Sequence, residues 1–149
     1  MLRSGFYWRC VMQASAREVA ERFLGVAAGG DLAALADLYS EDSVIELPFA
    51  PPGIPARFEG REGHRARFGR AATVVRHERV ANVVLHESTD PEVVIVEYDL
   101  HGHVLSSGQP FTRSYVMVMR VRDGLIVHSR DYADPAGSVG YRDEAARVS

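Results

Sequence analysis

Two long β-rich runs joined by a tight turn occupy residues 111–133, which read FTRSYVMVMRVRDGLIVHSRDYA. Asp123 and Gly124 separate the runs, and because glycine tolerates positive φ, this dipeptide is a strong signal for a tight hairpin. Two similar runs precede them at residues 78–87 and 92–105. Short breaks between long strands make neighbouring strands antiparallel, so we expect a meander of four strands.

The first half of the chain carries helical patterns instead. Ser15 and Glu18 form a capping box that starts a helix. Asp31 is placed to cap a second, shorter helix, which has Leu32, Leu35, Ala36 and Tyr39 on one side. Residues 61–72 have the spacing of a third. One strand, predicted at residues 43–49, lies between the second and third helices. Helices at one end of the sequence and strands at the other predict an α+β fold, with the helices packed on one face of the sheet.

Composition excludes several classes of function. The net charge is −3, which argues against nucleic acid as a partner because phosphate binding needs a concentrated basic field. All 17 basic residues are arginine, so lysine Schiff-base chemistry and a P-loop lysine are excluded. The single cysteine, Cys10, cannot form an internal disulfide and fits a cytoplasmic protein. No apolar run is long enough to span a membrane.

The 149 residues fit a single domain with a real core. We expect this domain to cover residues 15–135. Residues 1–14 are interpreted as a disordered or loosely docked extension, because Arg9 splits the apolar run that a signal peptide would need. Residues 136–149 are small and polar, and we expect a flexible tail or a lid.

Two stretches carry a family resemblance: residues 30–42, GDLAALADLYSED, and residues 130–135, RDYADP. Together with the order of elements they resemble the nuclear transport factor two-like superfamily. This group includes SnoaL-like polyketide cyclases, ketosteroid isomerases, limonene epoxide hydrolases and the phenazine biosynthesis A/B proteins. The resemblance implies a cone-shaped, curved, mixed or antiparallel sheet wrapped around N-terminal helices, with an internal apolar pocket and a homodimer formed through the sheet.

The resemblance also shows which family residues are replaced. The three polar positions of the ketosteroid isomerases hold Phe23, Leu47 and Met117, so the chain is not expected to be a ketosteroid isomerase. In the epoxide hydrolases, the final-strand aspartate matches Asp131, but the other two positions hold Tyr98 and Leu100.

The phenazine proteins match from residue 82 onward and have a glutamate where this chain has Asp131. Their pocket histidine is replaced by Ala81. In each comparison that retains a chemical group, the group is Asp131.

Asp131 is also the residue that the strand pattern selects. Alternation along residues 125–133 predicts one face made of Leu125, Val127, Ser129, Asp131 and Ala133. A carboxylate on an otherwise apolar face has a raised pKa, which suits an acid or base near neutral pH. The alternative is a structural Asp131 that bonds a backbone amide or pairs with Arg113.

Tyr98 is the second candidate catalytic residue. Alternation in its strand points it inward, where its hydroxyl could bond Asp131 or a substrate oxygen; the alternative is a core tyrosine with its hydroxyl at the rim. The residues expected to line the pocket and bind substrate are Phe23, Leu47, Phe49, His64, Phe68, Val96, Arg113, Tyr115 and Met117.

Two functional hypotheses follow. The first is an acid/base enzyme of the isomerase, cyclase or hydratase type, in which Asp131 moves a proton on a hydrophobic biosynthetic intermediate and no cofactor is needed. The second is a non-catalytic ligand-binding or dimerisation module of the same fold. We expect no metal site, because His101 and His103 share a strand face but have no evident third ligand.

Overall fold

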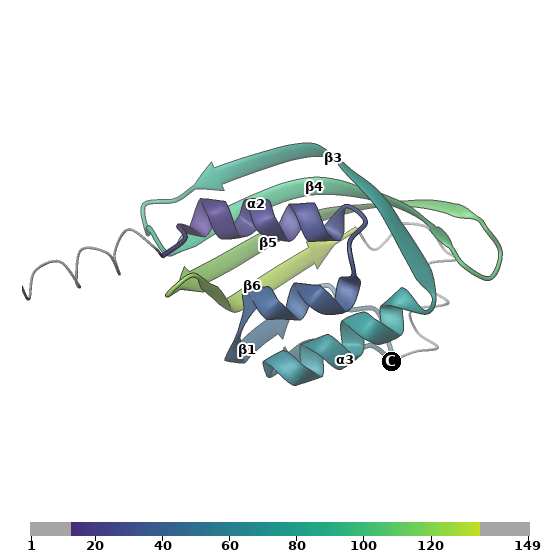
Figure 1. The fold of residues 1–149 in the computed structure, drawn as a ribbon, viewed down its shortest axis with the longest axis horizontal. Helices are drawn as coiled ribbons and strands as arrows, with labels where there is room; N and C mark the ends of the chain where they lie inside the picture. The colour runs from purple at the N-terminus through teal and green to yellow at the C-terminus, as the bar shows by residue number, and fades with distance from the viewer. Residues whose placement is uncertain (1–12, 135–149) are drawn as a thin grey trace, which may run out of the picture.

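Three helices cover one face of a curved, six-stranded sheet in the computed structural model, which describes residues 13–134 (Figure 1). In chain order the elements are α2 (Ala16–Ala27), the 3-10 helix η1 (Leu32–Leu38), β1 (Tyr39–Glu46), β2 (Arg57–Glu59), α3 (Arg61–Ala72), β3 (Val75–Glu87), β4 (Val93–Val104), β5 (Pro110–Arg122) and β6 (Leu125–Ala133). The predicted α+β class is confirmed. The predicted extension and tail fall almost wholly outside the described residues.

The sheet order is β2-β1-β6-β5-β4-β3. Strands β3 to β6 form the expected antiparallel meander. Strand β1 instead pairs parallel with β6 and antiparallel with the short strand β2, which the sequence did not predict. The mixed sheet therefore brings the early strand β1 directly beside the last strand.

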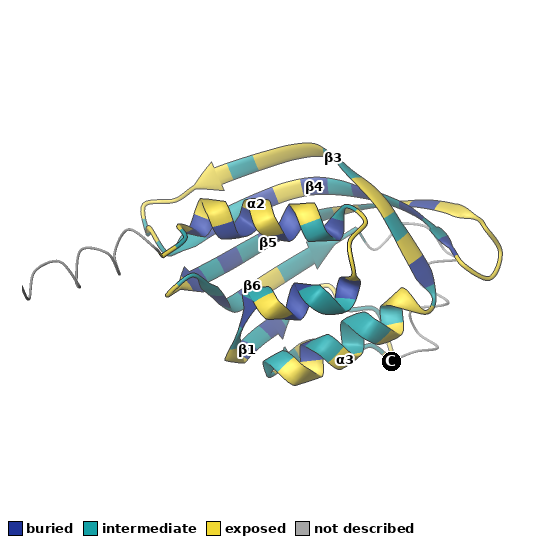
Figure 2. Cartoon of the chain, in the orientation of Figure 1, coloured by how far each residue is buried: buried dark blue, intermediate teal, exposed yellow. Residues whose placement is uncertain are grey.

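The helices begin where the capping signals place them. The Ser15 hydroxyl accepts a hydrogen bond from the Glu18 amide at 3.1 Å, and the Asp31 carboxylate accepts one from the Ala33 amide at 3.0 Å. One face of α2 is buried against the sheet (Figure 2). Tyr39, predicted on the second helix, instead begins β1.

Strand β1 ends at Glu46, three residues before the predicted end. Pro48 has no N–H to donate to a ladder, and the chain turns there, with the Ala50 amide bonded to the Leu47 carbonyl at 3.0 Å. Phe49 consequently leaves the inward-facing row of the strand and is 61% exposed.

A β-bulge in β6 sets which side chains face inward. Val121 pairs with Ile126 but Arg120 pairs with His128, so Val127 is an extra residue between them. The fully buried Ile126 therefore shares the inner face with Ser129 and Asp131. The predicted strict alternation, with Leu125 and Val127 on that face, is wrong because it allowed for no bulge.

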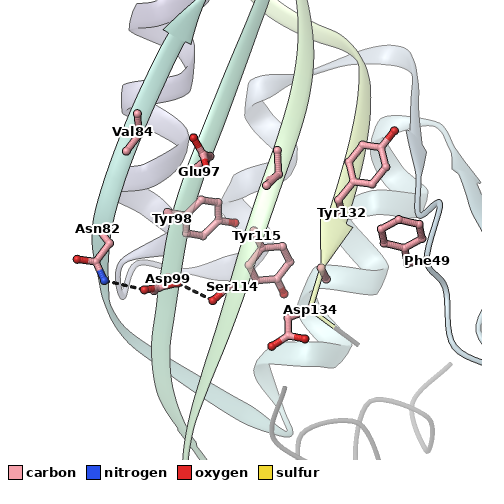
Figure 3. Close-up of a pocket in the computed structure, with 12 residues that line it drawn as sticks. Phe49, Asn82, Val84, Glu97, Tyr98, Asp99, Ser114, Tyr115, Tyr132 and Asp134 are labelled. Carbon is pink, nitrogen blue, oxygen red and sulfur yellow. Dashed lines mark hydrogen bonds between the residues drawn. The ribbon is translucent and has the colours of Figure 1, made fainter. Parts of the chain in front are cut away.

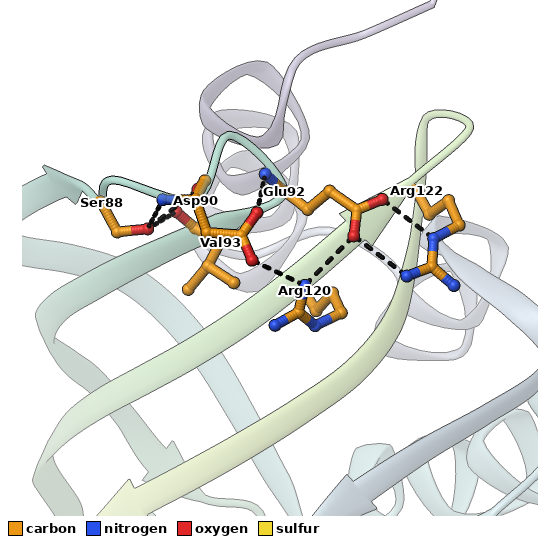
Figure 4. A network of polar contacts seen from close by, with 6 residues as sticks. All are labelled: Ser88, Asp90, Glu92, Val93, Arg120 and Arg122. Carbon is orange, nitrogen blue, oxygen red and sulfur yellow. Dashed lines mark hydrogen bonds and ion pairs between the residues drawn. The ribbon is translucent and has the colours of Figure 1, made fainter.

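Four charged side chains tie the turn between β3 and β4 to strand β5 (Figure 4). Arg120 donates to Asp90 at 2.9 Å and to Glu92 at 3.1 Å, and Arg122 holds both oxygens of Glu92 at 2.9 and 3.0 Å. The paired guanidinium of Arg122, then that of Arg120, lowers the pKa of Glu92 to about 2. This cluster fixes the end of the sheet at which β4 begins and β5 ends.

The close approach of β3 to Gly102 of β4 gives a prediction for stability. A Cβ there would lie 2.1 Å from the Arg76 carbonyl oxygen and 2.9 Å from the Phe111 ring. Backbone cannot yield as a side chain can, so Gly102→Ala should lower the free energy of unfolding by ~1–3 kcal/mol, the usual cost of overpacking. Urea denaturation measures this change.

Gly63→Ala is the matched control. Nothing lies within 4 Å of a Cβ at this position inside α3, so the same substitution should stabilise by ~0.5–1 kcal/mol. Equal effects at the two glycines would contradict the assigned packing of β3 against β4.

Candidate functional site

Asp131 lies on the inner face of β6, in one row with Met117 of β5 and Val96 of β4. Met117 and Val96 are buried, whereas Asp131 keeps part of its surface accessible. Burial among these apolar side chains raises the pKa of Asp131 to about 6, against weaker stabilisation of the carboxylate by Ser129 and by the charge of Arg67. The carboxyl group can therefore exchange a proton near neutral pH.

Ser129 is the direct polar partner of Asp131. The two side chains project from the same face of β6, and the Ser129 hydroxyl donates to Asp131 Oδ1. Ser129 itself is fully buried. The strand pattern predicted Ser129 on the same face as Asp131 but not the bond between them, so the structure adds a donor that holds the carboxylate in place.

Tyr39 approaches the same pair from β1. Its side chain is 1% exposed, and its hydroxyl interacts with Ser129 and with the charge of Asp131. Burial, and then the negative charge of Asp131, raise the pKa of Tyr39 well above its ordinary value. The phenol therefore stays protonated at neutral pH.

His64 lies on the other side of the Tyr39 ring. The ring centroids are 5.3 Å apart, and His64 Nε2 hydrogen-bonds Ser43 Oγ at 3.1 Å. Both His64 and Ser43 are 0% exposed, and burial lowers the pKa of His64, so the imidazole is neutral at physiological pH. His64 thus lies in the interior and bonds Ser43, and its role in binding substrate stays a prediction.

Arg67 supplies the positive charge of this region. It projects from α3, its guanidinium lies 3.8 Å from the centre of the Phe58 ring, and its field acts on Asp131, Tyr39 and His64. Sequence reasoning missed Arg67, Tyr39 and Ser43. The spacing of Arg67 after His64 on one helix was the available signal for it.

Tyr98 faces inward as predicted, but its hydroxyl donates to Met117 Sδ at 3.5 Å and not to Asp131. Its ring stacks on Tyr115 with the centroids 5.2 Å apart. Tyr98 pairs with Tyr115, whereas Asp131 pairs with Met117, so Tyr98 lies in the neighbouring row of inward-facing side chains.

The remaining predicted pocket residues divide by burial. Phe23, Val96 and Met117 belong to the buried core. Those that are only partly buried are Leu47, Phe68, Arg113 and Tyr115.

Phe49 is a correction, because it lies outside the interior. It contacts Tyr132 edge-on at 5.4 Å in a shallow groove of about 450 Å³ on the outer face of the sheet (Figure 3). The same groove contains Asp99, whose carboxylate accepts bonds from Ser114 at 2.6 Å and Asn82 at 2.7 Å. Asp131 does not line this groove.

Within residues 13–134, no three histidine, cysteine, aspartate or glutamate side chains gather closely enough to hold a metal ion. His103 pairs with Glu78, and His101 hydrogen-bonds Thr112 at 3.0 Å. In the same part of the chain, no helix has the length and hydropathy required to cross a membrane.

Comparisons with known proteins agree with this fold. Residues 20–129 match the model of the SnoaL-like domain. An uncharacterised PhzA/B-like protein from Pseudomonas aeruginosa is 36% identical over 124 residues, which cover 81% of this chain and 85% of that protein.

Two solved structures extend the comparison. A proposed isomerase from Bacillus subtilis is 30% identical with a TM-score of 0.77, over 90% of this chain and 94% of that one. A phenazine biosynthesis-related protein from Pseudomonas aeruginosa is 22% identical with a TM-score of 0.68, over 79% and 78%. The resemblance seen in residues 30–42 and 130–135 is thereby confirmed, and the chain belongs to the SnoaL-like domain family.

Proposed function

We propose that the protein is an acid/base enzyme of the isomerase, cyclase or hydratase type, which acts on a hydrophobic small molecule with Asp131 as the proton shuttle. One observation carries the proposal: Asp131 is desolvated by apolar neighbours and yet keeps accessible surface. A carboxylate with a pKa of about 6 is ionised at neutral pH and basic enough to take a proton from carbon.

The proposed division of labour follows from the contacts. Asp131 accepts the proton from the substrate, Ser129 holds the carboxylate, and the apolar row around Met117 excludes water. Arg67 and Arg113, on the elements that flank the site, are suited to balance negative charge that develops on a substrate oxygen. Family membership supports this type of chemistry, because the solved relatives include a proposed isomerase.

A chemical probe tests the base without knowledge of the natural substrate. A base that removes the C3 proton of 5-nitrobenzisoxazole causes the N–O bond to break, with its electron pair left on oxygen, and yields coloured 2-cyano-4-nitrophenolate. The wild-type kcat/KM should rise with pH through an apparent pKa of about 6 and level off above it, because only the carboxylate is a base. Stopped-flow absorbance gives the profile.

Asp131→Asn should lower kcat/KM for this probe at least ~100-fold, the usual contribution of a positioned base. Asp123→Asn is the matched control, because it makes the same chemical change at the exposed β5–β6 turn. A rate for Asp131→Asn equal to that of the control would exclude Asp131 as the base.

The raised pKa also has a consequence for stability. The folded state binds the Asp131 proton more tightly than the unfolded state, so wild-type stability falls as pH rises from about 4 to above 6. A shift from 3.8 to about 6 corresponds to a cost of up to ~3 kcal/mol at neutral pH. Asp131→Asn should therefore be the more stable protein in urea at pH 8 and lose most of that advantage at pH 4.

A second candidate function is a ligand-binding or dimerisation module, and the outer face of the sheet favours it. Phe49, Val84 and Val116 are large apolar side chains that remain exposed there, around the groove with Tyr132 (Figure 3). The face also carries the exposed Arg130 and the ionised Asp99, whose opposite charges could pair between two copies. We propose a homodimer through this face.

Val116→Arg tests the dimer, because it places a charge in the centre of the apolar patch. The variant should sediment as a monomer at a concentration where wild type sediments as a dimer. Leu105→Arg changes another exposed apolar residue, at the β4–β5 turn, and should leave the mass unchanged. A monomeric wild type would exclude the homodimer.

A further inference from the structure

The groove on the outer face of the sheet is acidic. Its lining includes Glu97, Asp99 and Asp134 and, among the described residues, no basic side chain (Figure 3). Two neutral groups hold the Asp99 carboxylate, because Ser114 donates to it at 2.6 Å and Asn82 at 2.7 Å. These bonds, that from Ser114 first, lower the pKa of Asp99, so the carboxylate is ionised at neutral pH. The groove therefore suits a cation, and its apolar walls suit one on a hydrocarbon stem.

Arg130 is an exposed cation on the same face of the sheet. Within residues 13–134, the structure records no hydrogen bond, ion pair or ring contact for its side chain. The carboxylate opposite it in register, Glu46 of β1, is already held by Arg57 at 3.0 Å and by His128 at 3.3 Å. Arg130 does not line the groove of its own copy. Its guanidinium is therefore available to a second molecule.

The strand register places Arg130 and Asp99 symmetrically about Val116. Arg130 of β6 lies opposite Val118 of β5, and Asp99 of β4 lies opposite Ser114 of β5. Val118 and Ser114 are each two residues from Val116, in opposite directions along β5, so they share its face of the sheet. The line from Arg130 to Asp99 therefore crosses β5 at Val116.

We propose that a two-fold axis at Val116 relates two copies of the chain, with Arg130 of each copy in the groove of the other, beside Asp99. The proposal rests on the homodimer proposed above and names its axis and its contacts. A two-fold interface uses the same patch on both copies, so a contact between two different residues occurs twice. An axis in the interface, at right angles to the line from Arg130 to Asp99, exchanges these residues and forms both ion pairs.

The surroundings of Val116 fit the centre of such an interface. Val116 is 38% exposed and would meet its own copy at the axis. Val84 of β3, 45% exposed, lies in the same row across the sheet. Glu97 lies between them in register, and its carboxylate is bonded by His86 at 2.5 Å. The axis is thus flanked by exposed apolar side chains, and the unpaired charges lie to either side, as in an interface with an apolar centre and a polar rim.

An exchange of charges tests the axis. Arg130→Asp places two carboxylates together at each of the two contacts, and Asp99→Arg places two guanidinium groups there. Each variant alone should therefore be monomeric at a concentration where wild type is dimeric. An equimolar mixture should form a dimer with one copy of each variant, because both contacts then join a carboxylate to a guanidinium. Native mass spectrometry distinguishes this mixed dimer from either homodimer.

Arg22→Asp is the matched control. It makes the same substitution at an exposed arginine of α2, and the helices cover the opposite face of the sheet (Figure 1). This variant should remain a homodimer, as wild type does.

Milder substitutions keep the pairing testable if Asp99→Arg disturbs the fold around Ser114 and Asn82. Arg130→Gln and Asp99→Asn each remove both ion pairs and should raise the dissociation constant of the dimer roughly tenfold, the worth of two interfacial pairs. The double variant should bind no more weakly than either single variant, because the pairs are already lost. Sedimentation equilibrium gives the three constants.

Three results would overturn the pairing in a protein whose wild type is dimeric: a homodimer of Arg130→Asp, a monomeric mixture of the two folded charge-exchange variants, or additive losses in the double variant. A monomeric wild type would instead refute the homodimer on which the proposal rests. Val116→Arg separates the two levels, because it disrupts a dimer through this face wherever the axis lies.

Discussion

Which side chains of strand β6 face inward decides what the interior of this fold contains. One extra residue, Val127, lets the buried Ile126 and the Ser129–Asp131 pair share the inner face. Without the bulge, a strand that begins with Ile126 facing inward would send His128 and Arg130 into the interior and Asp131 outward. The site therefore depends on the bulge, which leaves Val127 without a partner in the ladder. In return, apolar or site side chains face inward both before and after it.

The bulge places a carboxylate where the surroundings disfavour its charge. Met117 and Val96 on the adjoining strands cannot solvate it, and desolvation is the dominant influence on its pKa. The Ser129 hydroxyl and the charge of Arg67 offset part of that cost, and the part that is not offset appears as the raised pKa of Asp131. A structural aspartate would gain from a close cation, whereas a proton shuttle needs to be left incompletely compensated.

The sequence predicted the elements that local signals control. These are the helix caps at Ser15 and Asp31, the helix at residues 61–72 and the final hairpin, which depend on neighbouring residues, and the structure has them. The parallel pairing of β1 with β6 joins residues about ninety positions apart, and no local pattern encodes it. Tyr39 was consequently assigned to a helix face, and its position beside Ser129 could not be seen.

The same distinction explains the candidate site. Asp131 could be identified because it is a charged residue within one apolar strand face and because it matches a family position. Tyr98 and Phe49 were assigned by alternation alone: the first faces inward but bonds Met117, and the second follows Pro48, where alternation stops.

The same alternation along β6 sets the side chains of its inner face and of its outer face. Alternation that turns Asp131 toward the helices also turns Arg130 and Tyr132 toward the outer face, where Tyr132 lines the groove. A change at Val127 that shifted the strand by one residue would therefore exchange the two sets, burying a guanidinium and exposing the carboxylate. Since an arginine buried among Met117 and Val96 would lack a partner, the apolar row itself selects the register that keeps the proton shuttle inside. The carboxylate on the inner face and the composition of the exposed face are thus two consequences of the same strand alignment.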